Sequence, residues 1–143
     1  MMISTLKEIE LEDIAIICNY INDEASNNGV VTDPFVVSSN IEALIRDRCN
    51  GAYKIEDDGV IIAFTIYEKQ YHTNILTHFY VEPKYRAYRN VMVPLASKLV
   101  EIFKGQRLYY KKLHSKVDAI THYATNGEID LIALEEFVNR IKR

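Results

Sequence analysis

The residues best suited to bind or activate a charged ligand in this chain are the bases of one segment. Between Lys84 and Lys116 there are nine lysines and arginines and a single acid, Glu101, although the 143-residue chain carries a formal net charge of −3. A basic segment inside an acidic protein indicates an anionic ligand or partner. The residues alone leave one alternative open, which is a solvated helix face next to an exposed strand.

Neither the histidines nor the cysteines are spaced for a metal site. His72, His114 and His122 form no ligand spacing with a cysteine or an acid, so we predict no bound metal. Cys18 and Cys49 lie within apolar helical patterns, which predicts buried free thiols and no disulfide framework. No Ser-His-Asp or Cys-His arrangement for nucleophilic catalysis stands out.

One short segment has the composition of a nucleic-acid-binding surface. Tyr109-Tyr110-Lys111-Lys112 combines aromatic and basic side chains, which stack on bases and neutralise phosphates in such proteins. The same residues also fit an exposed strand, and we expect no nucleic-acid partner.

The composition is that of an ordinary globular protein. With 48% hydrophobic and 26% charged residues, the chain is expected to form a single domain over 1–143. No stretch approaches the roughly 20 apolar residues that a membrane span needs. Acids follow the first residues where a signal peptide would continue with an apolar core, so a cytoplasmic protein is expected.

In the first half of the chain, hydrophobic spacing predicts a short strand over 2–9 and a helix over 11–25. After a loop over 30–37, Ser38-Ser39-Asn40 is predicted to cap a second helix over Ile41–Cys49.

Three predicted strands follow. Ala52–Glu56 and Val60–Tyr67 are joined by Asp57-Asp58-Gly59, which is typical of a hairpin. Thr73–Val81 is a third strand, which Pro83 ends because proline has no backbone donor.

The second half is predicted to contain a long helix over Asn90–Lys104. Val91, Leu95, Leu99 and Ile102 lie along one side of it, and Pro94 is expected near its first turn. The remaining expected elements are a strand over Arg107–Leu113, a helix over Val117–Thr125, a turn at Asn126-Gly127 and a helix over Leu131–Ile141.

The order of these elements defines the fold class. We predict an α/β (α+β) protein with a central mixed sheet and helices on both of its faces. The 52–67 hairpin should be antiparallel. The strands around 75–81 and 107–113 should be parallel, because a crossover helix separates them.

Three sequence patterns resemble the GNAT (N-acetyltransferase-like) superfamily. Residues 53–64 are similar to its second and third strands, with a charged Gly-containing turn. Val81-Glu82-Pro83-Lys84-Tyr85-Arg86 is similar to the Val-x-Pro-x-x-Arg exit of its fourth strand, and Tyr123–Gly127 resembles its Tyr-x-x-x-Gly segment. The resemblance covers about residues 50–127 and implies a divergent GNAT-like member.

The resemblance implies acetyl-CoA as cofactor. In that family, glycines after the arginine let bare backbone amides at a helix N-terminus hold the pyrophosphate. Counted from Arg86, those positions are Arg89 and Val91. Because neither is glycine, we expect both side chains to stand where the pyrophosphate would sit and to weaken binding. The candidate cofactor-binding residues are Tyr80, Val81, Arg86, Ala87, Arg89, Asn90 and Val91.

The resemblance also implies roles for catalytic residues. Tyr123 would be the acid that protonates the leaving thiolate, and His78 the base facing the acceptor amine. Amides around Tyr80 and Val81 would stabilise the oxyanion. The alternatives are a tyrosine that only packs its ring and a half-buried structural histidine.

Two functions follow from these patterns. The first is an acyl-CoA-dependent N-acyltransferase that transfers an acetyl group to an unidentified amine, on either a small molecule or a peptide. The second is a non-catalytic GNAT-like domain with a structural or partner-binding role in an assembly. Assembly into a homo- or hetero-oligomer stays open at this point.

Overall fold

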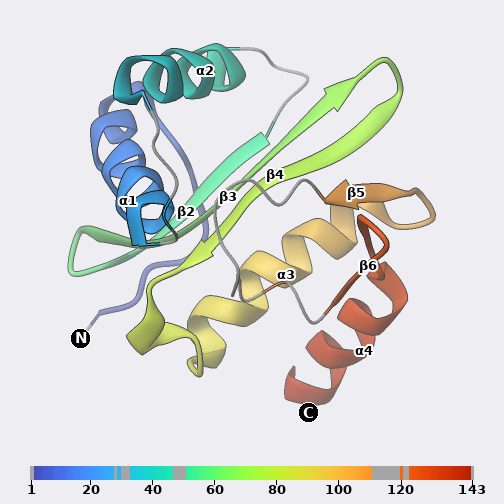
Figure 1. Ribbon diagram of the computed structural model, residues 1–143. Helices are drawn as coiled ribbons and strands as arrows, with labels where there is room; N and C mark the ends of the chain where they lie inside the picture. Colours follow the sequence, from blue (N-terminus) through green and yellow to red (C-terminus); the bar gives the residue numbers. More distant parts are fainter. Residues whose placement is uncertain are drawn as a thin grey trace.

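Seven strands form one sheet in the computed structural model of the chain, which describes residues 2–27, 29, 33–46, 51–110, 120 and 123–142. The order of the strands across the sheet is β1-β2-β3-β4-β5-β7-β6 (Figure 1). Their bounds are Lys7–Glu8 for β1, Gly51–Asp57 for β2, Val60–Gln70 for β3, Thr73–Val81 for β4, Leu108–Tyr110 for β5, Ala124–Thr125 for β6 and Glu128–Ile129 for β7.

The sheet is mixed, as predicted. Strands β1 to β4 are consecutive antiparallel neighbours, which confirms the hairpin at 52–67. Strand β5 runs parallel to β4, with Leu108–Tyr110 opposite Asn74–Leu76. The parallel pair is possible because helix α3 (Arg89–Phe103) carries the chain back between the two strands.

Helices cover both faces of the sheet (Figure 1). A short 3-10 turn, η1 (Leu11–Asp13), leads into α1 (Ile14–Asn27), which packs with α2 (Pro34–Arg46) on one face. On this side the buried core includes Ile17, Ile41 and Phe64. On the other face, α3 packs with α4 (Leu131–Lys142) over a second core that includes Leu76 and Leu95.

Helix α2 starts earlier than the sequence pattern predicted. It begins at Pro34, so residues 34–37 belong to the helix and not to a loop, and Ser38-Ser39-Asn40 lie inside it. Proline is favoured at the first helical position, because its missing N–H would have no helical partner there. The predicted end of this helix, with Cys49, falls outside the described residues, whereas Cys18 is buried as expected.

The predicted helix over Val117–Thr125 is wrong at its end. Ala124–Thr125 form strand β6, which pairs with β7. Asn126 and Gly127 have φ angles of +54° and +76°, and two such residues make the tight turn that joins a two-stranded hairpin. Most of residues 117–122 lie outside the described part of the chain. The final helix is confirmed, and the Asp130 side chain accepts a hydrogen bond from the Ala133 amide at 3.0 Å.

Pro94 lies inside α3, in its second turn, and not near its first. Its missing N–H leaves the Asn90 carbonyl without the usual intrahelical donor. The first turn of α3 is therefore held to the rest of the helix by one hydrogen bond fewer than if the proline were in the first turn.

Gly51 is predicted to tolerate no side chain. A Cβ built there would lie 2.0 Å from the Tyr67 ring, and Tyr67 is buried with its ring edge-on against Phe103. We expect Gly51→Ala to lower the free energy of unfolding by about 1–3 kcal/mol, the usual cost of overpacking. Urea denaturation measures this loss. In a Tyr67→Leu background, where the colliding ring is gone, Gly51→Ala should cost clearly less, and an equal cost in both backgrounds would contradict the explanation.

Candidate functional site

The end of β4 has one backbone edge turned away from β3. The Glu82 amide donates to the Ile62 carbonyl at 2.9 Å, and Tyr80 lies opposite Phe64. Hydrogen-bonded and non-hydrogen-bonded pairs alternate along antiparallel strands. The Tyr80 amide therefore belongs to the ladder with β3, whereas the Val81 amide points to the other side.

The side to which Val81 points has no strand beside it in the described residues. Within the described ranges, β5 pairs with β4 over Asn74–Leu76, well before the end of β4. Of the two amides expected to stabilise an oxyanion, Val81 is available and Tyr80 is not. The expectation for Tyr80 as an amide donor is thus wrong, because its register commits it to the sheet.

A short turn carries the chain from β4 into α3. It contains the 3-10 helix η2 (Pro83–Tyr85), and the Arg86 amide closes it by donating to the Pro83 carbonyl at 3.3 Å. The Arg86 side chain folds back, and its Nε donates to the Val81 carbonyl at 3.0 Å. Arg86 thereby links the end of β4 to the start of α3.

The start of α3 presents unused backbone donors. Within the described residues, the amides of Ala87, Arg89 and Asn90 donate no hydrogen bond, whereas those of Val91 and Met92 both donate to the Tyr88 carbonyl. No side chain caps the helix at Tyr88, and its first turn contains no acid. Free amides at the positive end of a helix dipole form an anion-binding site.

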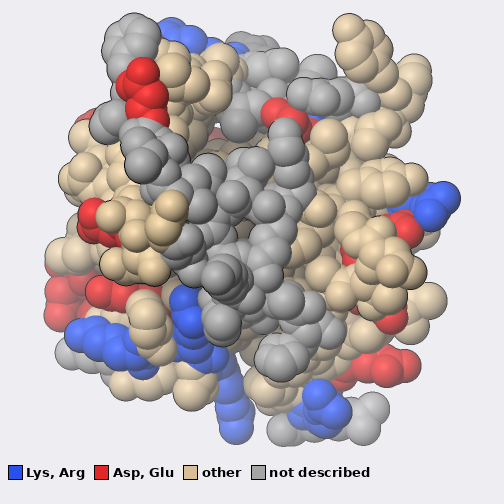
Figure 2. All heavy atoms as spheres, in the orientation of Figure 1, with Lys and Arg blue, Asp and Glu red and all other residues tan. Residues whose placement is uncertain are grey.

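Basic side chains surround this helix start. Lys84 and Arg89 are exposed and Arg86 is half-buried. Figure 2 shows basic side chains gathered over η2 and the beginning of α3, at the lower left of the molecule. These charges add to the helix dipole, so the electrostatic potential favours an anion such as a phosphate.

Val91 does not stand where a phosphate would sit, contrary to our expectation. Its side chain is fully buried in the core with Leu95 and Leu99. This is the position that helical spacing predicted for it, since residues 91, 95 and 99 share one face. Of the two residues that stand where the family pattern has glycine, Arg89 and Val91, only Arg89 directs its side chain to solvent.

Comparisons with known proteins bear on this arrangement. No protein-family model matches the chain, and no curated protein sequence does. Solved structures match with high coverage. A predicted acetyltransferase from Clostridium acetobutylicum, solved with acetyl-CoA, gives a TM-score of 0.67 at 14% identity over 87% of this chain and 90% of that one. The PaiA N-acetyltransferase from Thermoplasma acidophilum, in complex with coenzyme A, gives 0.56 at 14% identity over 90% and 96%.

A third match carries the name of the fold family. A protein from Staphylococcus aureus, described as a GNAT-family acetyltransferase, gives a TM-score of 0.57 at 13% identity over 77% of this chain and all of that one. The chain has the GNAT fold. The low identities agree with a divergent sequence. Within this GNAT fold, the free amides lie where α3 follows β4.

His78 and Tyr80 lie on the face of the GNAT sheet that α1 covers. The Tyr80 ring stacks on Phe64 at 5.3 Å and contacts Tyr20 at 5.1 Å, and the His78 ring lies 6.5 Å from Phe64. Burial, with the nearby Glu82 carboxylate, raises the pKa of Tyr80 to about 12. Tyr80 therefore stays protonated at neutral pH, and its side chain contributes an aromatic surface and no negative charge.

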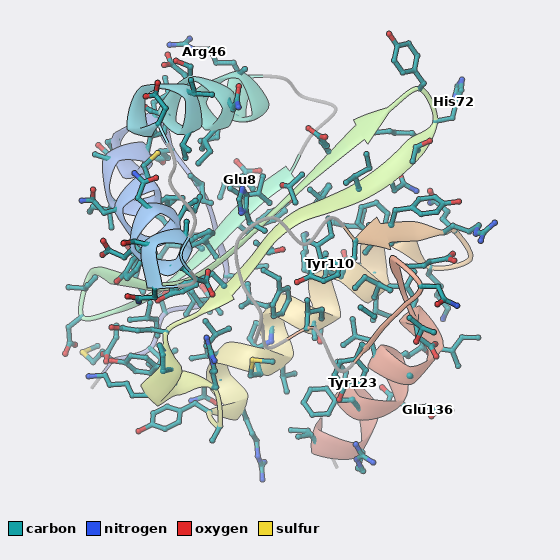
Figure 3. All side chains as sticks on the ribbon, viewed as in Figure 1. Glu8, Arg46, His72, Tyr110, Tyr123 and Glu136 are labelled. Carbon is teal, nitrogen blue, oxygen red and sulfur yellow. The ribbon has the colours of Figure 1, made fainter. Side chains whose placement is uncertain are left out.

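Tyr123 lies on the α4 side of the sheet, where it packs against the core cluster that includes Val81 and Val91. Its half-buried ring packs 5.6 Å from Phe137 of α4 (Figure 3). Among the described residues its hydroxyl makes no hydrogen bond, although its backbone carbonyl accepts from the Asp130 amide at 2.6 Å.

The described part of the chain contains no group of histidines, cysteines and acids that could hold a metal ion. None of its helices is long and apolar enough to cross a membrane.

Sequence reasoning missed the contact that ties the β2–β3 turn to this site. The Tyr85 hydroxyl donates to Asp57 at 2.5 Å. The position of Asp57 could have been predicted, because a two-residue turn at Asp58-Gly59 makes Asp57 the last residue of β2. Its partner, Tyr85, is far away in sequence and could be found only from the fold.

Proposed function

We propose that this protein is an acyl-CoA-dependent N-acyltransferase that transfers an acetyl group to an amine on a small molecule or a peptide. The observation that carries the proposal is the set of free amides of Ala87, Arg89 and Asn90 at the start of α3. These donors suit a pyrophosphate, because they combine hydrogen bonds with the positive end of the helix dipole. The solved structures that contain coenzyme A or acetyl-CoA share this fold.

The residues present fit the phosphate part of the cofactor. The amides of positions 87, 89 and 90 would hold the pyrophosphate, and Lys84, Arg86 and Arg89 would neutralise its charge. Acetyl-CoA supplies the activated acetyl group when it is bound. The cofactor-binding residues predicted at this turn keep that role in the proposal, except that Val91 acts through its place in the core.

The catalytic assignments are part of the same proposal. The Val81 amide points away from β3 and donates to no described residue, so it would be the donor for developing oxyanion charge. His78 would take the proton of the acceptor amine, and the Tyr123 hydroxyl would give its proton to the leaving group.

Arg89→Pro tests the amide at the first position of α3. Tyr88 already has φ −87° and ψ 120°, the extended backbone that a residue before proline adopts, so the variant should fold normally. The change removes one free amide and one guanidinium. Arg89→Ala removes only the guanidinium and is the matched control. We expect coenzyme A to bind Arg89→Pro about 10–100-fold more weakly than Arg89→Ala, the value of a hydrogen bond to a charged group.

Isothermal titration of the unmodified chain and both variants with coenzyme A gives the affinities, and thermal unfolding verifies that each variant is folded. Equal affinities of the proline and alanine variants would show that the position-89 amide is not a ligand. No binding by the unmodified chain would reject the proposal and leave the non-catalytic GNAT-like domain as the remaining interpretation.

A further inference from the structure

A carboxylate at the far end of a hairpin holds the turn that precedes α3. Asp57 is the last residue of β2, and its Oδ2 accepts the Tyr85 hydroxyl at 2.5 Å. Its Oδ1 accepts the Met2 amide at 3.1 Å, and Met2 in turn accepts the Asp58 amide at 3.1 Å. Asp57 is therefore anchored in the sheet on one side and bonded to η2 on the other.

Tyr85 connects Asp57 to the start of α3 through its contacts with Tyr88. The residue is 4% exposed, and its ring meets the Tyr88 ring edge-on at 5.4 Å. The Tyr85 carbonyl accepts the Tyr88 amide at 3.0 Å. Tyr88 is the residue before α3, and its carbonyl receives the amides of Val91 and Met92. The free amides at 87, 89 and 90 lie within this braced segment.

The segment needs such a brace because its own hydrogen bonds hold it weakly. The turn closes on a long bond of 3.3 Å between the Arg86 amide and the Pro83 carbonyl. No side chain caps α3, and uncapped helix ends fray. Pro94 removes a further intrahelical bond, the one to Asn90. An anion site made of amides works only while these amides are held in place.

The Tyr85 hydroxyl fixes the orientation of the side chain through a hydrogen bond, whereas a phenyl ring would only fill the space. A phenylalanine would fill the same buried space, but it would leave Asp57 without this donor. A hydrogen bond to a carboxylate is short and directional, and it is stronger than one between neutral groups. The Tyr85 hydroxyl lowers the pKa of Asp57, and Asp57 raises the pKa of Tyr85.

We propose that Asp57 and Tyr85 are positioning residues that fix the amide-bearing start of α3 for phosphate binding. This inference rests on the proposed function, since it assigns these two residues a part in binding coenzyme A. Neither residue needs to contact the cofactor. Their effect is to keep the amides of 87, 89 and 90 from moving with a fraying helix end.

Tyr85→Phe is the direct test, because it deletes only the hydroxyl. We expect coenzyme A to bind this variant about tenfold more weakly than the unmodified chain, the value of about one hydrogen bond. Asp57→Asn removes the charge but keeps an oxygen that can accept the Tyr85 hydroxyl. Its affinity for coenzyme A should lie between those of Tyr85→Phe and the unmodified chain. Tyr20→Phe is the matched control. It removes a hydroxyl that donates to the Ile61 carbonyl at 2.5 Å on the opposite side of the sheet, and it should leave the affinity unchanged.

Amide hydrogen exchange provides a second measurement that needs no cofactor. The amides of Val91 and Met92 report opening of the first turn of α3, because both donate to Tyr88. In Tyr85→Phe we expect them to exchange about tenfold faster, and in Tyr20→Phe at the unmodified rate. If Tyr85 contributed only to overall stability, Tyr85→Phe would instead speed the exchange of amides throughout the protein.

The outcomes separate this inference from the proposed function. If the unmodified chain binds coenzyme A and Tyr85→Phe binds it equally well, the positioning role is wrong and the proposed function stands. Unchanged exchange of the Val91 and Met92 amides in Tyr85→Phe would also overturn it. If the unmodified chain binds no coenzyme A, both fail together.

Discussion

Lys54→Met is expected to lower the free energy of unfolding by about 3–5 kcal/mol. Lys54 and Asp13 are each only 7% exposed, and the Lys54 ammonium lies 2.7 Å from an Asp13 carboxylate oxygen. Removing the ammonium leaves the Asp13 carboxylate buried without its counter-charge. Glu56, 3.5 Å from the same ammonium, keeps a second partner in Lys7 at 2.7 Å and is less affected.

The matched variant combines Lys54→Met with Asp13→Asn. The asparagine removes the uncompensated charge and can still accept the Glu10 amide, which now donates to Asp13 at 2.9 Å. We expect the double variant to recover most of the lost stability, because replacing both members of a buried pair is often nearly neutral. Urea denaturation of the three proteins measures this. A single variant that loses less than about 1 kcal/mol would mean that water reaches Asp13 and compensates its charge.

Tyr123→Phe is expected to reduce acetyl transfer about 100-fold, at the lower end of what a positioned general acid contributes. The substitution leaves the ring on Phe137 and removes only a hydroxyl that has no hydrogen-bond partner among the described residues. The stability of the variant should therefore stay close to that of the unmodified protein. Loss of turnover at constant stability would assign the effect to chemistry.

The measurement is steady-state turnover with acetyl-CoA and an amine on which the unmodified protein is active, together with the pH dependence of kcat. Tyr71→Phe is the control, because Tyr71 is 98% exposed in the turn between β3 and β4, at the end of β4 opposite to Val81. Its neighbour in sequence, His72, is labelled in Figure 3. Undiminished turnover in Tyr123→Phe would remove the acid role and leave Tyr123 as a packing partner of α4.

Much of the sheet could be predicted, because its strands carry local signals. The β-rich, mostly apolar runs at 60–67 and 73–81 and the Asp-Gly turn can be recognised from the local sequence alone, and β4 has the predicted bounds. The start of α2 was missed because Asp33-Pro34 is typical both of a loop and of a helix beginning. Strand β6 was missed because its pairing with β7 is decided by the turn at Asn126-Gly127, and two residues carry no periodicity.

The candidate site was predicted less well, because it depends on which way individual backbone amides and side chains point. Helical spacing placed Val91 on the core side, whereas alignment to a glycine pattern placed it against the phosphate, and only the first was right. The Tyr80 amide was assigned to the site although its register uses it in the sheet. The contact of Asp57 with Tyr85 joins two segments that no local pattern connects.

The free donors at 87, 89 and 90 have a consequence for how such a sequence changes over time. A backbone N–H is present in every amino acid except proline, so most substitutions at these positions keep the donor and alter only what surrounds it. The side chains at such positions can therefore vary while the donor-bearing end of the helix persists, provided that each side chain turns to solvent or to the core, as those of Arg89 and Val91 do. A sequence motif at such positions can then be lost while the backbone donors remain.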